Sequence, residues 1–165
     1  ADGWIEMVNS LDKTRGVPVV VNTAARNSTG VARYGQTLKS TLGELGRTMV
    51  TLWVINRQRD SLELLADYLD AMPAGADHQV HVVRNGYFGS AEKFQLYNGS
   101  QLKQRIEEGG GLTLDFPDLA DRVADQMATQ RLTIQGALKE MPLGHRAELI
   151  RWRDDAFKVL GRVMT

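Results

Sequence analysis

Short, uninterrupted apolar runs alternate along this chain with longer segments in which apolar residues recur every three or four positions. The first pattern is typical of parallel strands buried between helices, and the second is typical of amphipathic helices. The predicted strands cover residues 17–22, 48–55, 79–84 and 112–114. The predicted helices cover residues 3–13, 30–45, 61–72, 90–97, 100–107, 118–127, 131–139 and 143–163. The alternation predicts an α/β fold, with a doubly wound, mainly parallel sheet, helices on both faces and a helical C-terminus.

Residues that begin or end helices support these boundaries. Gly46 is expected to end the second helix, because glycine readily adopts the left-handed backbone that closes many helices. Asp60 or Ser61 is expected to cap the start of the third helix, and Ser100 the start of a later one. No internal repeat, low-complexity tract or linker interrupts the sequence. We therefore expect a single α/β domain over residues 1–165.

The overall composition narrows the class of protein. Twenty basic and twenty acidic residues cancel, which argues against a domain whose main task is to coat nucleic acid or an anionic membrane. The absence of cysteine excludes disulfides and thiolate metal sites. No apolar run approaches the roughly 20 residues that span a bilayer, and no signal-peptide pattern opens the chain, so we expect a soluble, cytoplasmic protein. The first residue is alanine rather than methionine, as expected of a fragment or a processed form.

Most familiar catalytic patterns are missing. The histidines, His78, His81 and His145, are scattered, which is more typical of solvated or strand-end positions than of a metal site. No motif of a serine hydrolase, zinc protease or dinucleotide-binding enzyme occurs in a suitable context. The last predicted helix interleaves basic, acidic and apolar residues, which favours packing or partner contact over nucleic-acid binding.

Residues 30–37 partly match the sequence motif of a phosphate-binding loop. They match the pattern G-x-x-x-x-G-K-[ST], except that Gln36 replaces the lysine that neutralises the β and γ phosphates. Gly30 also comes eight residues after Asn22, whereas a phosphate loop begins almost directly after its strand. We therefore interpret this segment as a chance match.

Polar side chains follow all four predicted strands, at Asn22, Asn56, Asn85 and Asp115. Ligands of open parallel sheets bind at the carboxyl ends of the strands, so these positions are the candidate binding residues. An asparagine amide both donates and accepts hydrogen bonds, which suits recognition of a purine base. Asparagine also favours turns, so each position taken singly has a structural explanation. Their coincidence at one edge of the sheet favours a ligand site.

Three short segments occur in a distinctive order: VPVVVNTAA at residues 17–25, VVRNGYFG at residues 82–89 and LTLDFPDL at residues 112–119. This order resembles that of the ParA/MinD-type (deviant Walker) P-loop ATPases. Within that superfamily, the chain looks most like plasmid conjugation and stability proteins of the TraL and StbB kind. The resemblance covers about residues 15–140, and the run RLTIQGAL at residues 131–138 continues it.

The resemblance implies roles for residues at the strand ends. Asn85 would contact the adenine of ATP, and Asp115, Phe116 and Pro117 would form the loop beneath the base. Asn22 falls at the Walker B-like position, where the family usually has an aspartate that holds the magnesium-bound water. A neutral amide stabilises a metal ion less than a carboxylate does, so efficient hydrolysis is not expected.

The Gly-rich Walker A loop of the family, which precedes the strand corresponding to residues 17–22, is absent from this sequence. That loop supplies the backbone amides and the lysine that cradle phosphates. The resemblance therefore implies that the chain is the C-terminal part of a longer, P-loop NTPase-like domain. ATP and Mg²⁺ are expected as cofactors, and ATPase activity is expected, only for a full-length protein with that loop. For this chain alone we expect no metal, no cofactor and no efficient ATP hydrolysis.

Two functions compete at this point. The first is part of a ParA/MinD-like nucleotide-dependent switch in plasmid maintenance, by partition, or in conjugative transfer. Such a protein would form a homodimer and act through protein partners of the plasmid or transfer system, with only indirect or weak DNA association. The alternative is a non-enzymatic protein-interaction or dimerisation module on a degenerate P-loop NTPase fold. A Walker A sequence upstream in the reading frame would favour the first.

Overall fold

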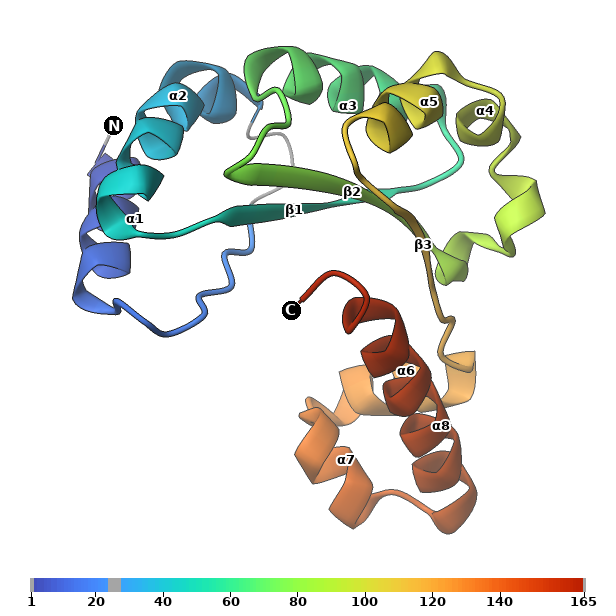
Figure 1. Ribbon diagram of the computed structural model, residues 1–165. Coiled ribbons are helices and arrows are strands. Elements are labelled where there is room, and N and C mark those ends of the chain that lie inside the picture. Colours follow the sequence, from blue (N-terminus) through green and yellow to red (C-terminus); the bar gives the residue numbers. More distant parts are fainter. Residues whose placement is uncertain (1, 24–27, 165) are drawn as a thin grey trace.

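A parallel sheet of three strands lies at the centre of the computed structural model, which describes residues 2–23 and 28–164. The strands are β1 (Met49–Ile55), β2 (His78–Asn85) and β3 (Thr113–Phe116), in the spatial order β1-β2-β3. Figure 1 shows β2 between its two neighbours. The predicted strands at residues 48–55, 79–84 and 112–114 are thus confirmed.

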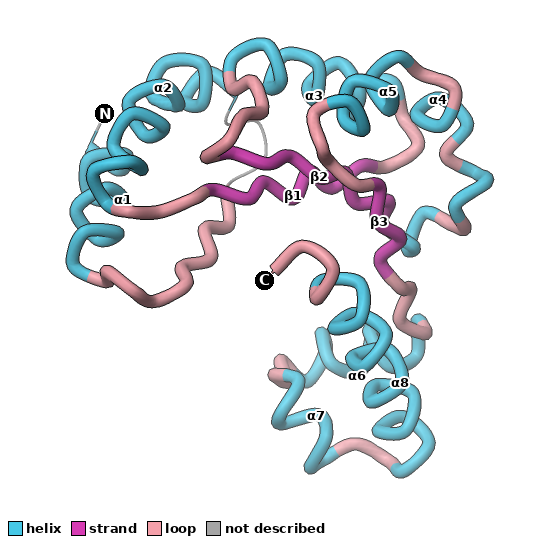
Figure 2. Tube along the Cα trace, viewed as in Figure 1, coloured by secondary structure: helices cyan, strands magenta, loops and turns pink. Residues whose placement is uncertain are grey.

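One face of the sheet is covered by the helices that connect the strands, as Figures 1 and 2 show. Helix α3 (Arg59–Ala71) connects β1 to β2, and α5 (Gln101–Glu108) lies before β3. Between β2 and α5 the chain forms the turns η1 (Gly86–Phe88) and η2 (Ala91–Lys93) and the short helix α4 (Gln95–Asn98). At the other end of this layer, α2 (Ser28–Leu45) packs against α3, and α1 (Asp2–Lys13) packs against α2.

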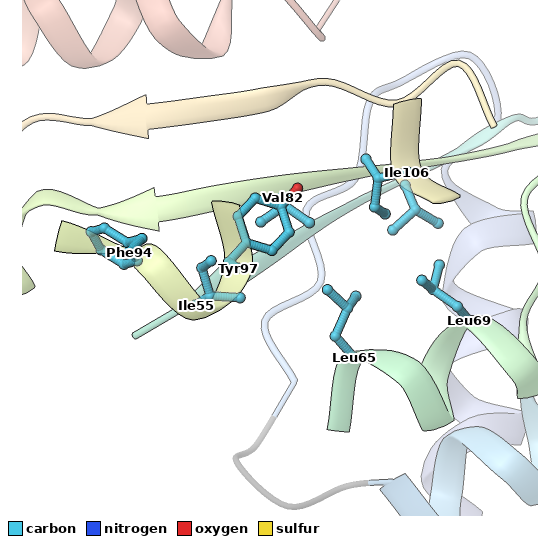
Figure 3. Close-up of a cluster of buried hydrophobic side chains, with 8 residues drawn as sticks. Ile55, Leu65, Leu69, Val82, Phe94, Tyr97 and Ile106 are labelled. Atoms are coloured by element: carbon cyan, nitrogen blue, oxygen red, sulfur yellow. The ribbon is translucent and has the colours of Figure 1, made fainter. Parts of the chain in front are cut away.

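The main core lies between the sheet and this helix layer (Figure 3). Apolar residues of α3, α4 and α5 meet the strand residues that alternate onto the same face. The buried members are Ile55, Leu65, Leu69, Val80, Val82, Phe94, Tyr97 and Ile106. A smaller cluster joins α1 to α2 through Leu11, Leu38, Leu42 and Leu45. Both faces of β2 are buried, one by the helix layer and the other by the C-terminus, which agrees with its apolar residues Val80, Val82 and Val83.

The other face of the sheet is covered near β2 and β3 by the C-terminus. There, Val163 packs against Val83 and Leu114. The C-terminal helices are α6 (Asp121–Gln130), α7 (Ile134–Glu140) and α8 (Leu143–Leu160), and they share a core of Val123, Ala137, Met141 and Leu149. The structure therefore confirms an α/β fold with a parallel sheet flanked by helices and a helical C-terminus. Both connecting helices lie on one face, so a full doubly wound arrangement stays a prediction.

Helix ends agree with the sequence at two of three predicted caps. Gly46 follows α2 with a φ of 62°, the left-handed backbone expected of it. The side chain of Ser100 accepts a hydrogen bond at the start of α5, as predicted. The prediction that Asp60 or Ser61 caps α3 is wrong, because α3 begins before either residue. Its N-cap is Gln58, which makes no side-chain capping bond.

The predicted strand at residues 17–22 is wrong. Residues 18–23 form no helix or strand, and no described strand is hydrogen-bonded to them. A β-strand is defined by a hydrogen-bonded neighbour, so an apolar sequence alone is not sufficient. Part of the loop predicted after this segment, residues 24–27, lies outside the described residues.

Residues 30–37, the chance match to a phosphate loop, lie inside α2 and therefore form no loop. Gly35 packs tightly against the side chain of Met72, which explains a small residue at this position without any ligand. Across residues 2–23 and 28–164, no helix has both the length and the apolar character that crossing a bilayer would require.

Candidate functional site

The carboxyl ends of β2 and β3 lie side by side, because the two strands are neighbours in parallel register. Asn85 lies opposite Phe116. A Cβ on the next residue, Gly86, would lie 2.5 Å from the carbonyl oxygen of Phe116 and 2.8 Å from the amide nitrogen of Asp118, so only glycine permits this approach. Asn85, Asp115, Phe116 and Pro117 are therefore brought together. Asn56, the candidate residue after β1, lies at the same edge of the sheet, because Ile55 before it is paired with Arg84.

Asn85 ends β2 and shapes the turn that follows it. Its Oδ1 accepts a hydrogen bond from the backbone N–H of Tyr87 at 3.1 Å, the local turn that asparagine favours. No described residue accepts a hydrogen bond from the Asn85 Nδ2, and the side chain is half-buried. Since an amide oxygen has two lone pairs, Asn85 can still both donate to and accept from a ligand.

Asp115 is held by Arg84, which the sequence analysis did not single out. Arg84 donates to both carboxylate oxygens, from Nε to Oδ1 at 2.7 Å and from Nη2 to Oδ2 at 3.0 Å. Its Nη1 donates to the Oδ1 of Asn98 at 2.7 Å. Asp115 therefore joins β3 to β2 and does not stand free beneath a base. A lone arginine in an apolar strand was the signal that could have revealed this pair.

Phe116 and Pro117 are fixed by the C-terminal helix α8. The indole Nε1 of Trp152 donates to the carbonyl oxygen of Pro117 at 2.9 Å. The ring of Phe116 meets the ring of Trp152 edge to face, with centroids 5.8 Å apart and an interplanar angle of 81°. The hydrogen bond joins residues 35 positions apart in the chain, and no local pattern signals it. It gives the predicted base-side loop a rigid support.

Two aromatic side chains project beside Asn85. Tyr87 is 69% exposed and Phe88 is 36% exposed, and their rings meet edge to face with centroids 5.2 Å apart. Exposed aromatic rings next to an amide with free hydrogen-bonding capacity are a combination that suits a planar ligand. Gly89, with a φ of 112°, ends this turn.

A partly buried pair of hydroxyl groups supports β3 from the side of the helix layer. The Oη of Tyr97 lies 2.8 Å from the Oγ1 of Thr113. Burial raises the pKa of the Tyr97 phenol, so it stays neutral at physiological pH and serves as a packed hydrogen-bonding group. Tyr97 is one of the largest fully buried side chains and was not among the predicted site residues.

Asn22, the predicted Walker B-like residue, is not placed by a strand. It lies in the irregular segment described above, and its side chain is exposed. The residues on either side of it, Val21 and Thr23, are also exposed. The structure therefore does not join Asn22 to the four residues at the ends of β2 and β3 through any strand pairing.

The three histidines make hydrogen bonds to other residues of the chain. His78 and His81 are both buried in β2, so neither is solvated. His78 is the first residue of the strand, as a strand-end position predicts, whereas His81 lies inside it, where the prediction is wrong. The Nε2 of His78 lies 3.0 Å from the Oγ1 of Thr51 and 3.2 Å from the Oη of Tyr68. Burial lowers the pKa of both imidazoles, which favours their neutral form. The described residues contain no group of three potential metal ligands.

The sequence matches no protein-family model and no solved structure. It is 60% identical over 164 residues to Protein MobD of Acidithiobacillus ferrooxidans, across 99% of this chain and 71% of that protein. Identity at this level along nearly the whole chain shows common descent. The chain therefore belongs to the MobD family.

Proposed function

We propose that this chain is the base-side part of a ParA/MinD-like, nucleotide-dependent switch protein that acts in plasmid maintenance or conjugative transfer. The observation that supports this proposal is the Asn85 amide, held at the end of the central parallel strand with a donor and an acceptor free. Open parallel sheets bind their ligands at this edge. The name of the MobD relative is compatible with a plasmid system.

Adenine is the base that fits the asparagine chemistry. Its exocyclic amino group and a neighbouring ring nitrogen match the acceptor and the donor of one asparagine amide. Asn85 would supply that pair of hydrogen bonds, and the exposed ring of Tyr87 offers a face for stacking, a contact of about 1–3 kcal/mol per base. Phe116 and Pro117, supported by Trp152, would form the wall of the site. Asp115, paired with Arg84, would set the strand ends in place without touching the base.

The phosphate side of the site would come from residues outside this chain. The sequence has no Gly-rich loop with a lysine, and Asn22 stands at the Walker B-like position. ATP and Mg²⁺ would therefore bind to a longer P-loop NTPase-like protein with a Walker A loop, and this chain alone would not hydrolyse ATP. That protein would act as a homodimer through partners of a plasmid or transfer system, with weak or indirect association with DNA.

The test is the affinity of the complete gene product for a fluorescent ATP analogue in the presence of Mg²⁺. Asn85→Asp keeps an oxygen that accepts from the Tyr87 N–H but removes the amide donor and adds a negative charge. We expect the Kd to rise by at least about fivefold, because losing one hydrogen bond to a ligand costs about 1–3 kcal/mol. The melting temperature should change little, since the turn keeps its acceptor.

Asn9→Asp is the control. Asn9 is exposed in α1, away from the ends of β2 and β3 (Figure 1), so the same change of amide to carboxylate is made outside the candidate site. This variant should bind the analogue like the wild-type protein. Equal losses of affinity in both variants, or a complete gene product that binds no ATP, would contradict the proposal.

A non-enzymatic protein-interaction or dimerisation module is the second candidate function. The observation that favours it is a group of exposed valines, Val17, Val19, Val20 and Val21, on a segment without a described strand neighbour. An apolar group of this kind is typical of a surface that another segment or partner covers. Light scattering separates the two candidates when ATP is varied, because the switch requires a nucleotide-dependent association and the module does not.

A further inference from the structure

Strand β1 has one unpaired edge. The backbone N–H of Met49 donates to the carbonyl oxygen of Asp77 at 2.8 Å, so the odd-numbered residues of β1 face β2. Because successive residues of a strand point in alternate directions, the N–H and C=O groups of Val50, Leu52 and Val54 face the opposite edge. No described residue forms a backbone hydrogen bond with that edge.

This edge has none of the features that usually protect an edge strand. The sequence of β1, MVTLWVI, contains no charged residue and no proline over seven residues. Natural edge strands avoid unwanted pairing through charges, prolines, bulges or short length. The side chains of Val50 and Val54 are 42% and 58% exposed on the face opposite α3. The composition of β1 is therefore that of an interior strand, although its position is at an edge.

Residues 17–21 have the same mismatch between sequence and surroundings. Val17, Val19, Val20 and Val21 are 58%, 43%, 83% and 49% exposed. A run of four valines in five positions is typical of a strand buried on both faces, yet it has no strand neighbour among the described residues. Its exposure is unfavourable, because apolar surface gains free energy when it is removed from water.

Arg47 connects the two apolar segments. It lies two residues before β1, and its Nη1 donates to the carbonyl oxygen of Val17 at 2.9 Å. Its Nη2 donates to the carbonyl oxygen of Thr14 at 2.6 Å. The start of the valine segment is therefore linked to the start of β1 by the side chain of Arg47. The two backbones form no hydrogen bonds with each other. The Arg47 Nε is buried and has no partner among the described residues.

We propose that one further segment of the MobD polypeptide adds to the sheet as a strand, between β1 and the valine segment of residues 17–21. It hydrogen-bonds to the free edge formed by Val50, Leu52 and Val54. The MobD relative is long enough to supply it, since the matched region covers 71% of that protein. A strand in this place is buried on both faces, so the segment is an uncharged, continuously apolar run. The inference does not depend on nucleotide binding.

The test measures amide hydrogen exchange by NMR, without nucleotide, in this chain and in the complete gene product. In this chain the amides of Val50, Leu52 and Val54 should exchange fast, while those of Thr51 and Trp53 exchange slowly. In the complete product the first three should slow by at least about 100-fold, as expected of a ladder amide that opens only when the sheet unfolds. Fast exchange of these amides in both proteins would overturn the proposal.

A second copy of the chain is the competing occupant of this edge. It would protect the same three amides in the 165-residue chain, and the protection would increase with protein concentration together with the mass measured by light scattering. That result would overturn the proposal. Because the exchange is measured without ATP, these outcomes stay the same even if the protein proves not to bind ATP.

Two variants of the complete product provide a test that does not require this chain to fold alone. Val54→Asp introduces a charge at the free edge, and Leu96→Asp introduces the same charge on α4, at a side chain that is 52% exposed. Val54→Asp should lower the melting temperature clearly more than Leu96→Asp does. Equal effects of the two changes would overturn the proposal.

Discussion

Arg84 shows how a single side chain organises the candidate site. Its side chain is 13% exposed, and its guanidinium group makes three hydrogen bonds, two to Asp115 and one to Asn98. Asn98 in turn donates to the carbonyl oxygen of Ala91 at 2.8 Å. One arginine therefore joins β2, β3 and the segment around α4. Such a planar, bidentate group fixes orientation better than a lysine could.

The two partners of the Arg84–Asp115 pair should contribute unequally to stability. Arg84→Met leaves the Asn98 Oδ1 without its donor in a half-buried place, which should lower the free energy of unfolding by about 1–3 kcal/mol. Asp115 is 58% exposed, so Asp115→Asn should cost less than about 1 kcal/mol. Urea denaturation of both variants measures the difference. A larger loss for Asp115→Asn than for Arg84→Met would show that the arginine network is not the stabilising element.

At the scale of elements, the sequence predicted the positions of those helices and strands that depend on local patterns. The apolar runs of β1, β2 and β3 and the periodicity of α3, α5 and α8 were sufficient to place them. The turn at Asn85 was also predictable, because the Asn-Gly pair carries its own turn chemistry.

Contacts between distant elements were not predictable in the same way. The Arg84–Asp115 pair depends on the register of two strands, and the Trp152–Pro117 hydrogen bond depends on where α8 docks. Neither leaves a periodic signal in the sequence. The prediction of a strand at residues 17–22 was wrong for a related reason. Their apolar run is typical of a strand, but a strand also requires a hydrogen-bonded neighbour.

The turn after β2 is the element that most needs its exact sequence. Gly86→Ala would place a Cβ against the backbone of Phe116 and Asp118, so we expect a loss of about 1–3 kcal/mol in the free energy of unfolding. Gly144→Ala is the control, because nothing lies within 4 Å of a Cβ at this position in α8. That change should be neutral or stabilising by up to about 1 kcal/mol. Urea unfolding of both variants tests the close approach, and equal stabilities would contradict it.

At the scale of the whole molecule, two bodies of structure meet at one face of the sheet. The helices α6, α7 and α8 have a core of their own, and the end of the chain returns to cover β2 and β3. In Figure 1 the C-terminus lies below the sheet, opposite the layer of α3 and α5. The Phe116–Trp152 contact also joins α8 to the end of β3, so the packing of α8 against the sheet supports the candidate site.

Val163 tests whether this docking holds the molecule together. It is 7% exposed against Val83 and Leu114, so Val163→Asp would bury an unpaired carboxylate and should lower the free energy of unfolding by about 2–4 kcal/mol. The adjacent Met164 is 56% exposed, and Met164→Asp should change stability by less than about 0.5 kcal/mol. Urea transitions followed by circular dichroism and by tryptophan fluorescence should coincide for both proteins if sheet and helices unfold as one unit. Separate transitions, or equal stabilities of the two variants, would mean that the helical C-terminus folds independently and does not support the site.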